Sequence, residues 1–290
     1  MKTSTETDSI AGRTGWEKAL ELIADAGFDC WDFSLLKMCS YNWQTGERII
    51  TGHPLENRET AIPFAENLRK VADSLGITCN QSHAPFPVSC PAIRELLPLA
   101  LECTAAAGGT ICVIHPDNNK TPEENSVMYR ELLPVAHKYG VAIATENMWN
   151  WNDKEDCAAP AACSDGPSFT RHIDIVNDPY LVACVDVGHA EMRGLNTSAD
   201  KMIRELGPRV KALHLHDNDK RRDYHRLPFS MDIDFAPAVK ALKDIGYSGV
   251  FTLESTLAAA LQDIGSDDPA EGVRAMFRAT RRLADMFENI

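Results

Sequence analysis

Short β-rich runs alternate with longer amphipathic segments along the whole chain, and this alternation restricts the folds it can adopt. Between the runs, helical periodicity predicts helices that include residues 15–27, 61–76, 92–108, 124–140, 235–246 and 272–290. Most of these segments end in glycine just before the next strand, as expected for a helix that stops at a short turn. The eight predicted strands cover residues 2–7, 30–35, 77–83, 110–116, 141–147, 181–189, 210–217 and 249–255.

Eight strand-plus-helix units of about 35 residues fill almost all of the 290 residues, which predicts an α/β fold of the (β/α)8 TIM barrel type. The competing fold is a doubly wound open sheet. Its usual signatures are missing, because no glycine-rich dinucleotide motif follows the first strand and no GxxxxGK(S/T) sequence occurs. No linker-like stretch divides the chain, so we expect residues 1–290 to form a single domain.

The charge balance bears on the partners of the protein. Forty-two acidic residues against 29 basic ones give a formal net charge of -13, which argues against a nucleic-acid partner. No apolar run is long enough for a membrane span or signal peptide, and the nine cysteines contain no CxxC pair, so we expect a cytoplasmic protein with free thiols. The sequence leaves both a monomer and a homo-oligomer open.

Polar residues that can bind metals stand at the ends of six consecutive predicted strands. In a parallel barrel the C-terminal ends of all strands meet at one rim, so residues far apart in sequence converge on one pocket. Six of the nine histidines belong to these segments; the exceptions are His53, His137 and His172. The converging residues are His83, His115, Glu146, Asp186, His189, His214, Asp223, His225 and Glu254.

The acidic residues in this set predict a metal site. Glu146, Asp186 and Glu254 each follow apolar residues, and a buried carboxylate is costly unless it meets a cation. With His214 as a fourth ligand, the site would be rich in oxygen and suit one divalent ion: manganese, magnesium, cobalt or zinc. His216 points to the same side of its strand as His214, and we expect it to be a pocket wall or to donate a hydrogen bond to a ligand.

Seven short motifs between residues 77 and 255 carry a resemblance to a known family: "SHAPF", "VIHP", "TEN", "VDVGHAEM", "LHLHDND", "DYH" and "LES". In order and spacing they resemble the xylose-isomerase-like barrel superfamily, which holds sugar phosphate isomerases and epimerases together with apurinic endonucleases of the endonuclease IV type. The resemblance implies an isomerase or epimerase that acts on a small sugar, sugar phosphate, polyol or keto acid.

Its tagatose epimerase branch implies roles for single residues. One divalent ion would be held by Glu146, Asp186, His214 and Glu254. The two glutamates would also be the acid/base pair, which removes a proton next to a carbonyl on one face and returns it on the other by way of an enediolate. A dehydratase or lyase using the same intermediate stays open, as does a barrel that binds a sugar without turning it over.

The endonuclease branch of the superfamily offers a different interpretation. Its trinuclear zinc site would add His83, His115, His189, Asp223 and His225 as ligands, and all five are present. In isomerase relatives such histidines line the substrate pocket instead. The stretch "DYHRLPFSMDID" lacks the arginine and glycine of the endonuclease pattern, which favours the isomerase.

Substrate specificity is expected in the loops at 38–58, 147–167 and 217–232. Trp149 and Trp151 would either stack on a sugar or pack their own loop. The run Lys220, Arg221 and Arg222 is interpreted as a solvated charge run, with phosphate binding as the alternative. The sequence does not decide whether Asp32 and Ser34, which end the second strand, reach the pocket.

Overall fold

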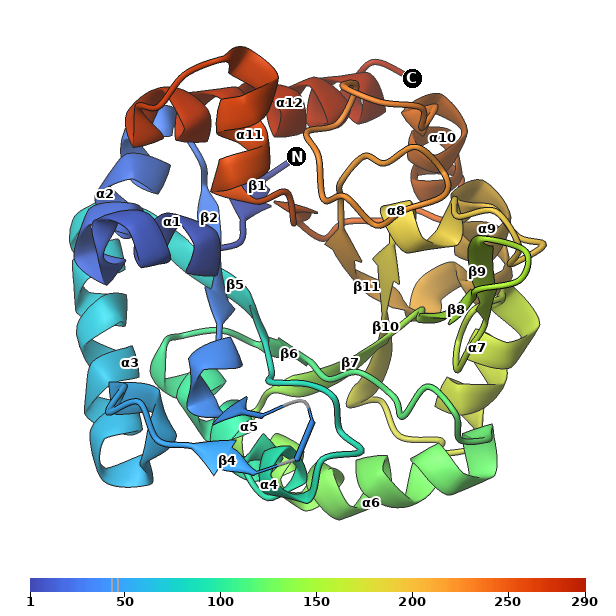
Figure 1. Cartoon of the computed structure of the whole chain (residues 1–290), viewed down its shortest axis with the longest axis horizontal. Coiled ribbons are helices and arrows are strands. Elements are labelled where there is room, and N and C mark those ends of the chain that lie inside the picture. The colour runs from blue at the N-terminus through green and yellow to red at the C-terminus, as the bar shows by residue number, and fades with distance from the viewer. Residues whose placement is uncertain (43, 46) are drawn as a thin grey trace.

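Eight parallel strands follow one another around a ring in the computed structural model, which describes residues 1–42, 44–45 and 47–290 (Figure 1). Each predicted strand is found, although β1, β6 and β12 are only three residues long, because the chain turns into loops before the predicted runs end. The strands are β1 (Thr3–Thr5), β2 (Cys30–Ser34), β5 (Thr78–His83), β6 (Ile111–Val113), β7 (Ala142–Glu146), β10 (Leu181–Asp186), β11 (Val210–His214) and β12 (Phe251–Leu253).

Backbone pairing closes the ring. Six strands form a parallel sheet in the order β11-β10-β7-β6-β5-β2, and β1 pairs with β12. Single parallel bridges join the two parts, one from Glu6 to Asp32 and one from Leu215 to Leu253. The predicted (β/α)8 barrel is therefore confirmed.

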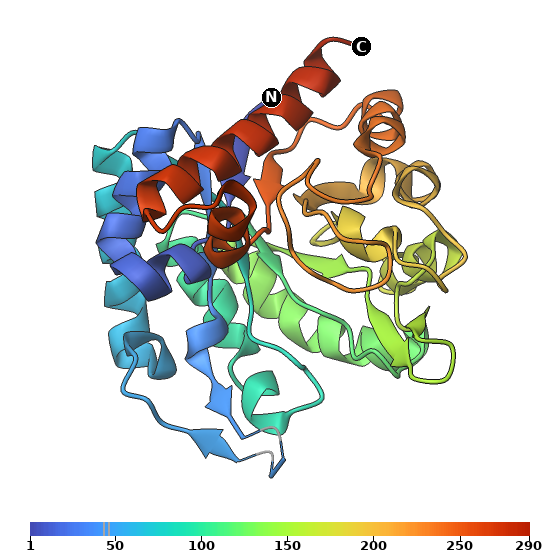
Figure 2. The ribbon, with the colours of Figure 1, turned by 45° about the horizontal axis from the view of Figure 1, so that its top comes forward.

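Helices surround the strands on the outside (Figures 1 and 2). The last of them lies beside β1, and the amino group of Met1 forms an ion pair with Glu288 near its end. The helices are α1 (Asp8–Thr14), α2 (Trp16–Ala26), α3 (Arg58–Ser74), α4 (Pro91–Arg94), α5 (Leu97–Ala106), α6 (Pro122–Tyr139), α7 (Gly166–Asp174), α8 (Val187–Ala190), α9 (Ala199–Leu206), α10 (Phe235–Asp244), α11 (Leu257–Ile264) and α12 (Pro269–Glu288). Short 3-10 turns cover η1 (Leu36–Met38), η2 (Pro54–Glu56) and η3 (Gly207–Arg209).

One predicted helix, at residues 92–108, is wrong as a single element. The structure divides it into α4 and α5. Pro98 lies in the first turn of α5 and has no N–H to donate to the carbonyl of Arg94, against which its ring would also clash in a continuous helix. The predicted glycine stops are confirmed at Gly27 and Gly140, which end α2 and α6 with φ of 105° and 68°.

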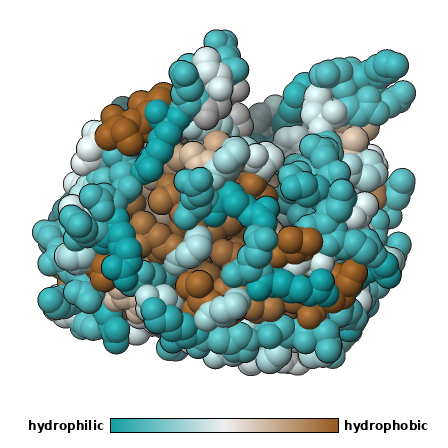
Figure 3. Space-filling view, turned by 90° about the horizontal axis from the view of Figure 1, so that it is seen from below, coloured by the Kyte–Doolittle hydropathy of each residue, from teal (hydrophilic) through white to brown (hydrophobic). Residues whose placement is uncertain are grey.

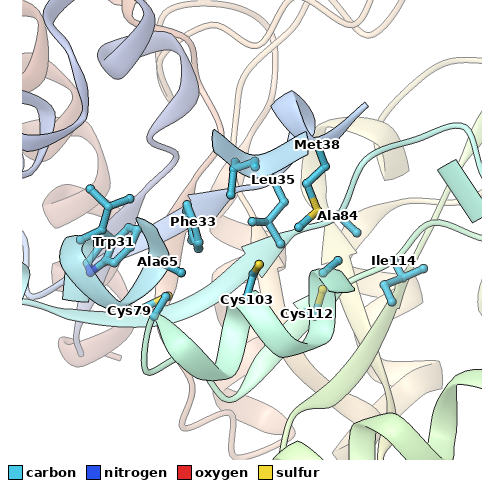
Figure 4. Close-up of a cluster of buried hydrophobic side chains, with 14 of the residues drawn as sticks. Trp31, Phe33, Leu35, Met38, Ala65, Cys79, Ala84, Cys103, Cys112 and Ile114 are labelled. Atoms are coloured by element: carbon cyan, nitrogen blue, oxygen red, sulfur yellow. The ribbon is translucent and has the colours of Figure 1, made fainter. Parts of the chain in front are cut away.

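The core lies between the strands and the helices. Every residue of β2 and β10 is buried, as expected for strands of a parallel sheet that are covered on both faces. Figure 4 shows one part of this layer, where Trp31 and Phe33 from β2 lie near Cys79 of β5 and Cys103 of α5. All nine cysteines are unpaired, in agreement with the prediction of free thiols.

The side chains inside the barrel change character along the strands. Below the C-terminal ends of the strands, the inside of the barrel is filled by a small apolar group: Val113, Ala144, Val182, Cys184 and Ala212. The next inward positions toward the C-terminal ends are charged or polar, because strand residues two apart point to the same side. The apolar layer therefore forms the floor of a polar pocket at the C-terminal rim.

Two of the three predicted specificity loops contain hairpins that the sequence did not indicate. The first loop holds β3 (Ser40–Tyr41) and β4 (Arg48–Ile49), and residues 43 and 46 within it lie outside the described part of the chain. The second loop holds β8 (Trp149–Asn152) and β9 (Cys157–Pro160). Both connections leave the C-terminal ends of barrel strands, on the side of the pocket.

Figure 3 shows the molecule from below relative to the view of Figure 1. On this face, apolar side chains gather within a hydrophilic surface. Large exposed apolar residues of the chain include Ile49 at the end of the first hairpin, Ile50 directly after it and Val127 on α6. No helix within the described residues is both long and apolar enough to cross a bilayer.

Candidate active site

Four predicted ligands converge at the C-terminal rim, and we call them the Glu146 cluster: Glu146, Asp186, His214 and Glu254. One nitrogen or oxygen atom from each lies within 4.8 Å of the others. The Nδ1 atom of His214 is 3.2 Å from Oε1 of Glu146 and 3.4 Å from Oε2 of Glu254. Each residue ends, or directly follows, a different strand: β7, β10, β11 and β12. The structure therefore brings these four side chains together at the rim.

The Glu146 cluster concentrates negative charge in a buried place. Within the described residues, no lysine or arginine forms an ion pair with Glu146, Asp186 or Glu254; their ionic partners are histidines. Burial, together with repulsion from Glu146 and Asp186, raises the pKa of Glu254 to about 8. Burial alone would also raise the pKa of Glu146, but His214 and His115 hold it well below its ordinary value. Three facing carboxylates and an imidazole are a donor set that fits a divalent cation.

Three neighbours that sequence reasoning did not assign hold these ligands in place. Asn147 joins β7 to β10 through two hydrogen bonds of 2.8 Å, accepting from the backbone N–H of Asp186 and donating to its carbonyl. The Nε2 atom of His214 lies 3.1 Å from Nε2 of Gln81 and 3.6 Å from Oδ2 of Asp32. Gln81 also donates to Asp32 at 2.9 Å. The signal for Asn147 was its place directly after Glu146 in "TEN"; Gln81 sits inside a strand run and gave none.

A second group, which we call the His189 cluster, lies next to the first and consists of His189, His216, Asp223 and His225. Their ligand atoms are also within 4.8 Å of one another. Oδ2 of Asp223 lies 3.2 Å from Nε2 of both His189 and His225. His216, expected to be either a pocket wall or a hydrogen-bond donor to a ligand, lies 3.1 Å from the carboxylate of Asp186. Eight of the predicted residues thus form two adjoining clusters.

The loop after β11 carries half of the His189 cluster and is held by one buried residue. The carboxylate of Asp217 accepts hydrogen bonds from the N–H groups of Met231 and Ile233 at 2.9 and 3.0 Å. Its own backbone pairs with Arg226 in both directions. His225 adopts a left-handed φ of 46°, and its Nδ1 lies 2.8 Å from the carbonyl oxygen of Glu254. The loop therefore folds back over the rim of the barrel.

The two remaining predicted histidines lie on the other side of Glu146. Nε2 of His115 is 3.2 Å from Oε2 of Glu146 and 3.0 Å from Nε2 of His83. Burial and the neighbouring His115 lower the pKa of His83 to about 3. Phe86, which the sequence did not single out, stacks on His115 with ring centroids 4.8 Å apart.

Two cavities open beside these clusters. The first, of about 410 Å³, lies over the loops that follow β5, β6 and β7 and is lined by residues such as Trp149, Asn118 and Asn150. The second, of about 210 Å³, lies toward β1 and β2. Among the described residues, four line both cavities: His83, Phe86, His225 and Glu254.

The sequence left two interpretations open for the two tryptophans and for the basic run at residues 220–222, and the structure places these residues differently relative to the cavities. Trp149 lines the first cavity, whereas Trp151 stacks under the guanidinium of Arg222 at 4.1 Å. Arg222 and Arg221 also form ion pairs with Asp156 of the second hairpin. Lys220 pairs with Glu191 at 3.1 Å. The three cations of this run are therefore engaged by carboxylates in the described structure and do not line either cavity.

Comparison with known sequences gives relatives of modest similarity. An uncharacterised protein of Methanocaldococcus jannaschii, MJ1311, is 27% identical over 191 residues, which cover 60% of this chain and 63% of the relative. The Sinorhizobium fredii protein y4fM is 25% identical over 56% of this chain and 52% of its own length. The chain thus spans between half and two thirds of these relatives.

Solved structures share the fold over the whole chain. A D-tagatose 3-epimerase-like protein superposes with a TM-score of 0.72 at 20% identity, covering 100% of this chain and 98% of the other. A D-psicose 3-epimerase solved in the presence of D-fructose gives 0.71 at 14% identity, covering 99% of each chain. The IOLI protein, solved with a bound zinc atom, gives 0.70 at 17%, covering 100% and 99%. At these identities the likeness establishes the fold.

A sequence model described as Xylose isomerase-like TIM barrel matches residues 20–283. That range contains seven of the eight barrel strands and every residue of both clusters. The expected superfamily is thereby confirmed: the chain belongs to the xylose isomerase-like TIM barrel family.

Proposed function

We propose that the protein is a divalent-metal-dependent isomerase or epimerase of a sugar or a related polyol or keto compound. The observation that carries the proposal is the convergence of Glu146 and Glu254 on one position, together with Asp186 and His214. The epimerases among the solved structures of the same fold support this choice of reaction.

The ligands proposed for the metal are the four residues of the Glu146 cluster. Their buried carboxylates lack a lysine or arginine partner in the described chain, and manganese, magnesium, cobalt and zinc all accept this mixture of oxygen and nitrogen donors. When bound there, the ion would polarise a substrate carbonyl and stabilise the negative charge that develops on its oxygen.

Proton transfer is assigned to the two glutamates. They approach the cluster from β7 and from the end of β12, so one can face each side of a substrate carbon. Glu146 removes a proton as a carboxylate, in keeping with its lowered pKa. Glu254 delivers a proton to the opposite face or to the neighbouring carbon, which gives an epimer or an aldose–ketose isomer respectively.

The role proposed for the surrounding histidines is to bind substrate hydroxyl groups. His83, His225 and Glu254 line both cavities, and His115 and His189 line the first. Such groups orient the substrate so that the reacting carbon lies beside both glutamates.

A zinc phosphodiesterase is the second candidate, and the His189 cluster favours it. Its four ligand atoms are as close together as those of the Glu146 cluster, and His83 and His115 form a third group with Glu146. Three metal positions would be compatible with this arrangement, as in the endonuclease branch that the sequence resembles.

Metal content and substrate exchange together test these proposals. Protein purified without added metal or chelator is analysed by elemental mass spectrometry, then incubated in D2O with ketohexoses, their phosphates and a phosphodiester. One equivalent of metal and incorporation of deuterium at carbon support the isomerase. Two or three equivalents of zinc with cleavage of the phosphodiester would replace it by the second candidate.

A further inference from the structure

The second cavity is not used by the proposed proton transfer, which needs only the Glu146 cluster and the first cavity. It extends from Glu254 toward the ends of β1 and β2 and is lined by residues such as Glu6, Ser9, Ser34 and Leu36. In Figure 1 these elements lie across the ring from the loops of β6 and β7, which border the first cavity. A ligand centred on Glu254 can therefore extend in two directions.

Two residues that line the second cavity each hold a buried polar atom without a partner among the described residues. Ser34 is 4% exposed and Asp32 is 2% exposed, and the atoms are Oγ of Ser34 and Oδ1 of Asp32. Buried polar groups in native proteins are nearly always satisfied, and leaving one unpaired is unfavourable. A ligand that carries hydroxyl groups would satisfy both atoms, because a hydroxyl donates to a carboxylate and also accepts from a serine.

The side chains around the second cavity disfavour a phosphate or carboxylate group there. Its lining holds the carboxylates of Glu6, Asp8 and Asp32 in addition to Glu254, and no lysine or arginine among the described residues lines it. The first cavity also has no lysine or arginine in its described lining. An anionic substituent would meet repulsion in the second cavity, whereas an uncharged polyhydroxylated group would not.

An aromatic face stands where the cavities meet. Phe86 is 37% exposed and lines both of them, with its ring stacked on His115. Exposed aromatic side chains at the mouth of a pocket offer a flat apolar surface on which the C–H face of a sugar ring can pack. Its position suits the junction between two sugar units.

We propose that the second cavity is a subsite for an uncharged second sugar unit, so that the substrate is a glycoside of two rings and not a monosaccharide or a sugar phosphate. Ser34 and Asp32 bind hydroxyl groups of this second unit, while the reacting unit lies beside Glu146 and Glu254. This inference rests on the proposed function, whose substrate class it narrows.

The test uses two variants that differ by one position along the chain. Leu36→Trp places a large side chain at a position that lines only the second cavity. Lys37→Trp introduces the same side chain at the exposed neighbouring position, which lines neither cavity. The metal-loaded proteins are incubated in D2O with D-fructose, D-fructose 6-phosphate, and the two-ring ketoses isomaltulose and lactulose. Exchange of carbon-bound hydrogen is followed by NMR.

We expect kcat/KM for exchange into a two-ring ketose to exceed that for D-fructose by about tenfold or more, which is the effect of a satisfied subsite. In Leu36→Trp this ratio falls toward one, whereas Lys37→Trp keeps the wild-type ratio. Equal rates for one and two rings, a preference for the phosphate, or a ratio unchanged by Leu36→Trp would each overturn the inference.

Failure of the proposed function gives a different result. If none of the sugars takes up deuterium from D2O, whichever divalent metal is supplied, the proposed isomerase is wrong. Saturation-transfer NMR of the same sugars then tests the subsite alone. Contact of the protein with both rings of a two-ring ketose, lost in Leu36→Trp, supports the subsite. Contact with one ring only, or with none, overturns it.

Discussion

The Glu146 cluster and the His189 cluster lie side by side but are held in different ways. The first takes its four side chains from the ends of four barrel strands, whose backbones are fixed by parallel pairing. The second takes His189 from the short helix α8 and Asp223 and His225 from the loop after β11. A site on strand ends has fixed geometry, whereas one that includes a loop depends on the contacts that hold the loop. We therefore expect chemistry at the first cluster and adaptable substrate contacts at the second.

The largest effect is expected from the two glutamates of the Glu146 cluster. Glu146→Gln and Glu254→Gln keep the size of the side chain but remove the proton-transfer group, so kcat should fall by about 10²–10⁴-fold. Deuterium incorporation from D2O measures this. Circular dichroism controls for folding, and a variant that retains wild-type exchange would show that its glutamate is not the acid or base.

The next effect tests how rigidly the Glu146 cluster is held. Asp32 is the carboxylate beside the Nε2 atom of His214, so Asp32→Asn should weaken metal binding by about 10–100-fold without removing a ligand. Competition with a chromophoric chelator gives the affinity. Asp73→Asn on the exposed surface of α3 is the matched control, and an unchanged affinity in Asp32→Asn would mean that His214 needs no such partner.

Asp223→Asn asks whether the His189 cluster behaves differently from its neighbour. This carboxylate joins His189 and His225, and its loss should lower kcat/KM by about tenfold through disturbed substrate contacts. The metal content should stay at one equivalent per chain. The loss of a bound metal on this substitution would instead identify the His189 cluster as a second metal site.

A smaller effect is expected at Arg222, where the loop after β11 contacts the second hairpin. Arg222 stacks on Trp151 and pairs with Asp156, which ties the loop after β11 to the second hairpin. Arg222→Ala removes both contacts at an exposed site, so KM should rise by about two- to fivefold with kcat nearly unchanged. Steady-state kinetics separate the two constants. A fall in kcat as large as that of Glu254→Gln would contradict a loop that only adapts to substrate.

The smallest effect is expected at Glu6, which belongs to neither cluster and changes the stability of the fold. Burial raises the pKa of Glu6 to about 7, so the folded state holds this proton more tightly than the unfolded chain, whose carboxyl has its ordinary value of 4.5. The stabilisation is complete below pH 4.5 and is lost as the pH rises to 7. Glu6→Gln should therefore be more stable than wild type at pH 8, by on the order of 1 kcal/mol, and not at pH 4.5. Urea titrations at both pH values measure the free energy of unfolding. The same change in this free energy between the two pH values in wild type and Glu6→Gln would contradict the prediction.

The difference between the clusters also explains what could be predicted from sequence. Glu146, Asp186 and His214 each end an apolar run, and parallel strand ends share one rim, so their convergence follows from the order of the elements alone. Asp223 and His225 were candidates because they stand in the loop that follows the strand of His214. Their position depends on the hydrogen bonds that Asp217 receives from residues 14 and 16 positions ahead, which no periodic pattern encodes.

Other features escaped sequence reasoning for similar physical reasons. The β8–β9 hairpin depends on cross-strand contacts in a polar loop. Its first strand is a short Trp-Asn-Trp-Asn alternation, but no Asn-Gly turn follows to mark a hairpin. Phe86 follows the predicted strand 77–83 and looked like an ordinary apolar loop residue. Only the closed barrel brings it beside His115 and between two cavities.

The four residues shared by the two cavities also have a consequence for inhibitor discovery. A small molecule found to bind in one cavity and another found in the other would approach each other at Glu254 and Phe86. Joining them with a short linker makes the second binding event intramolecular, at an effective concentration of about millimolar, without any new contact. The chain therefore offers a natural target for linking two weak fragments into one selective ligand.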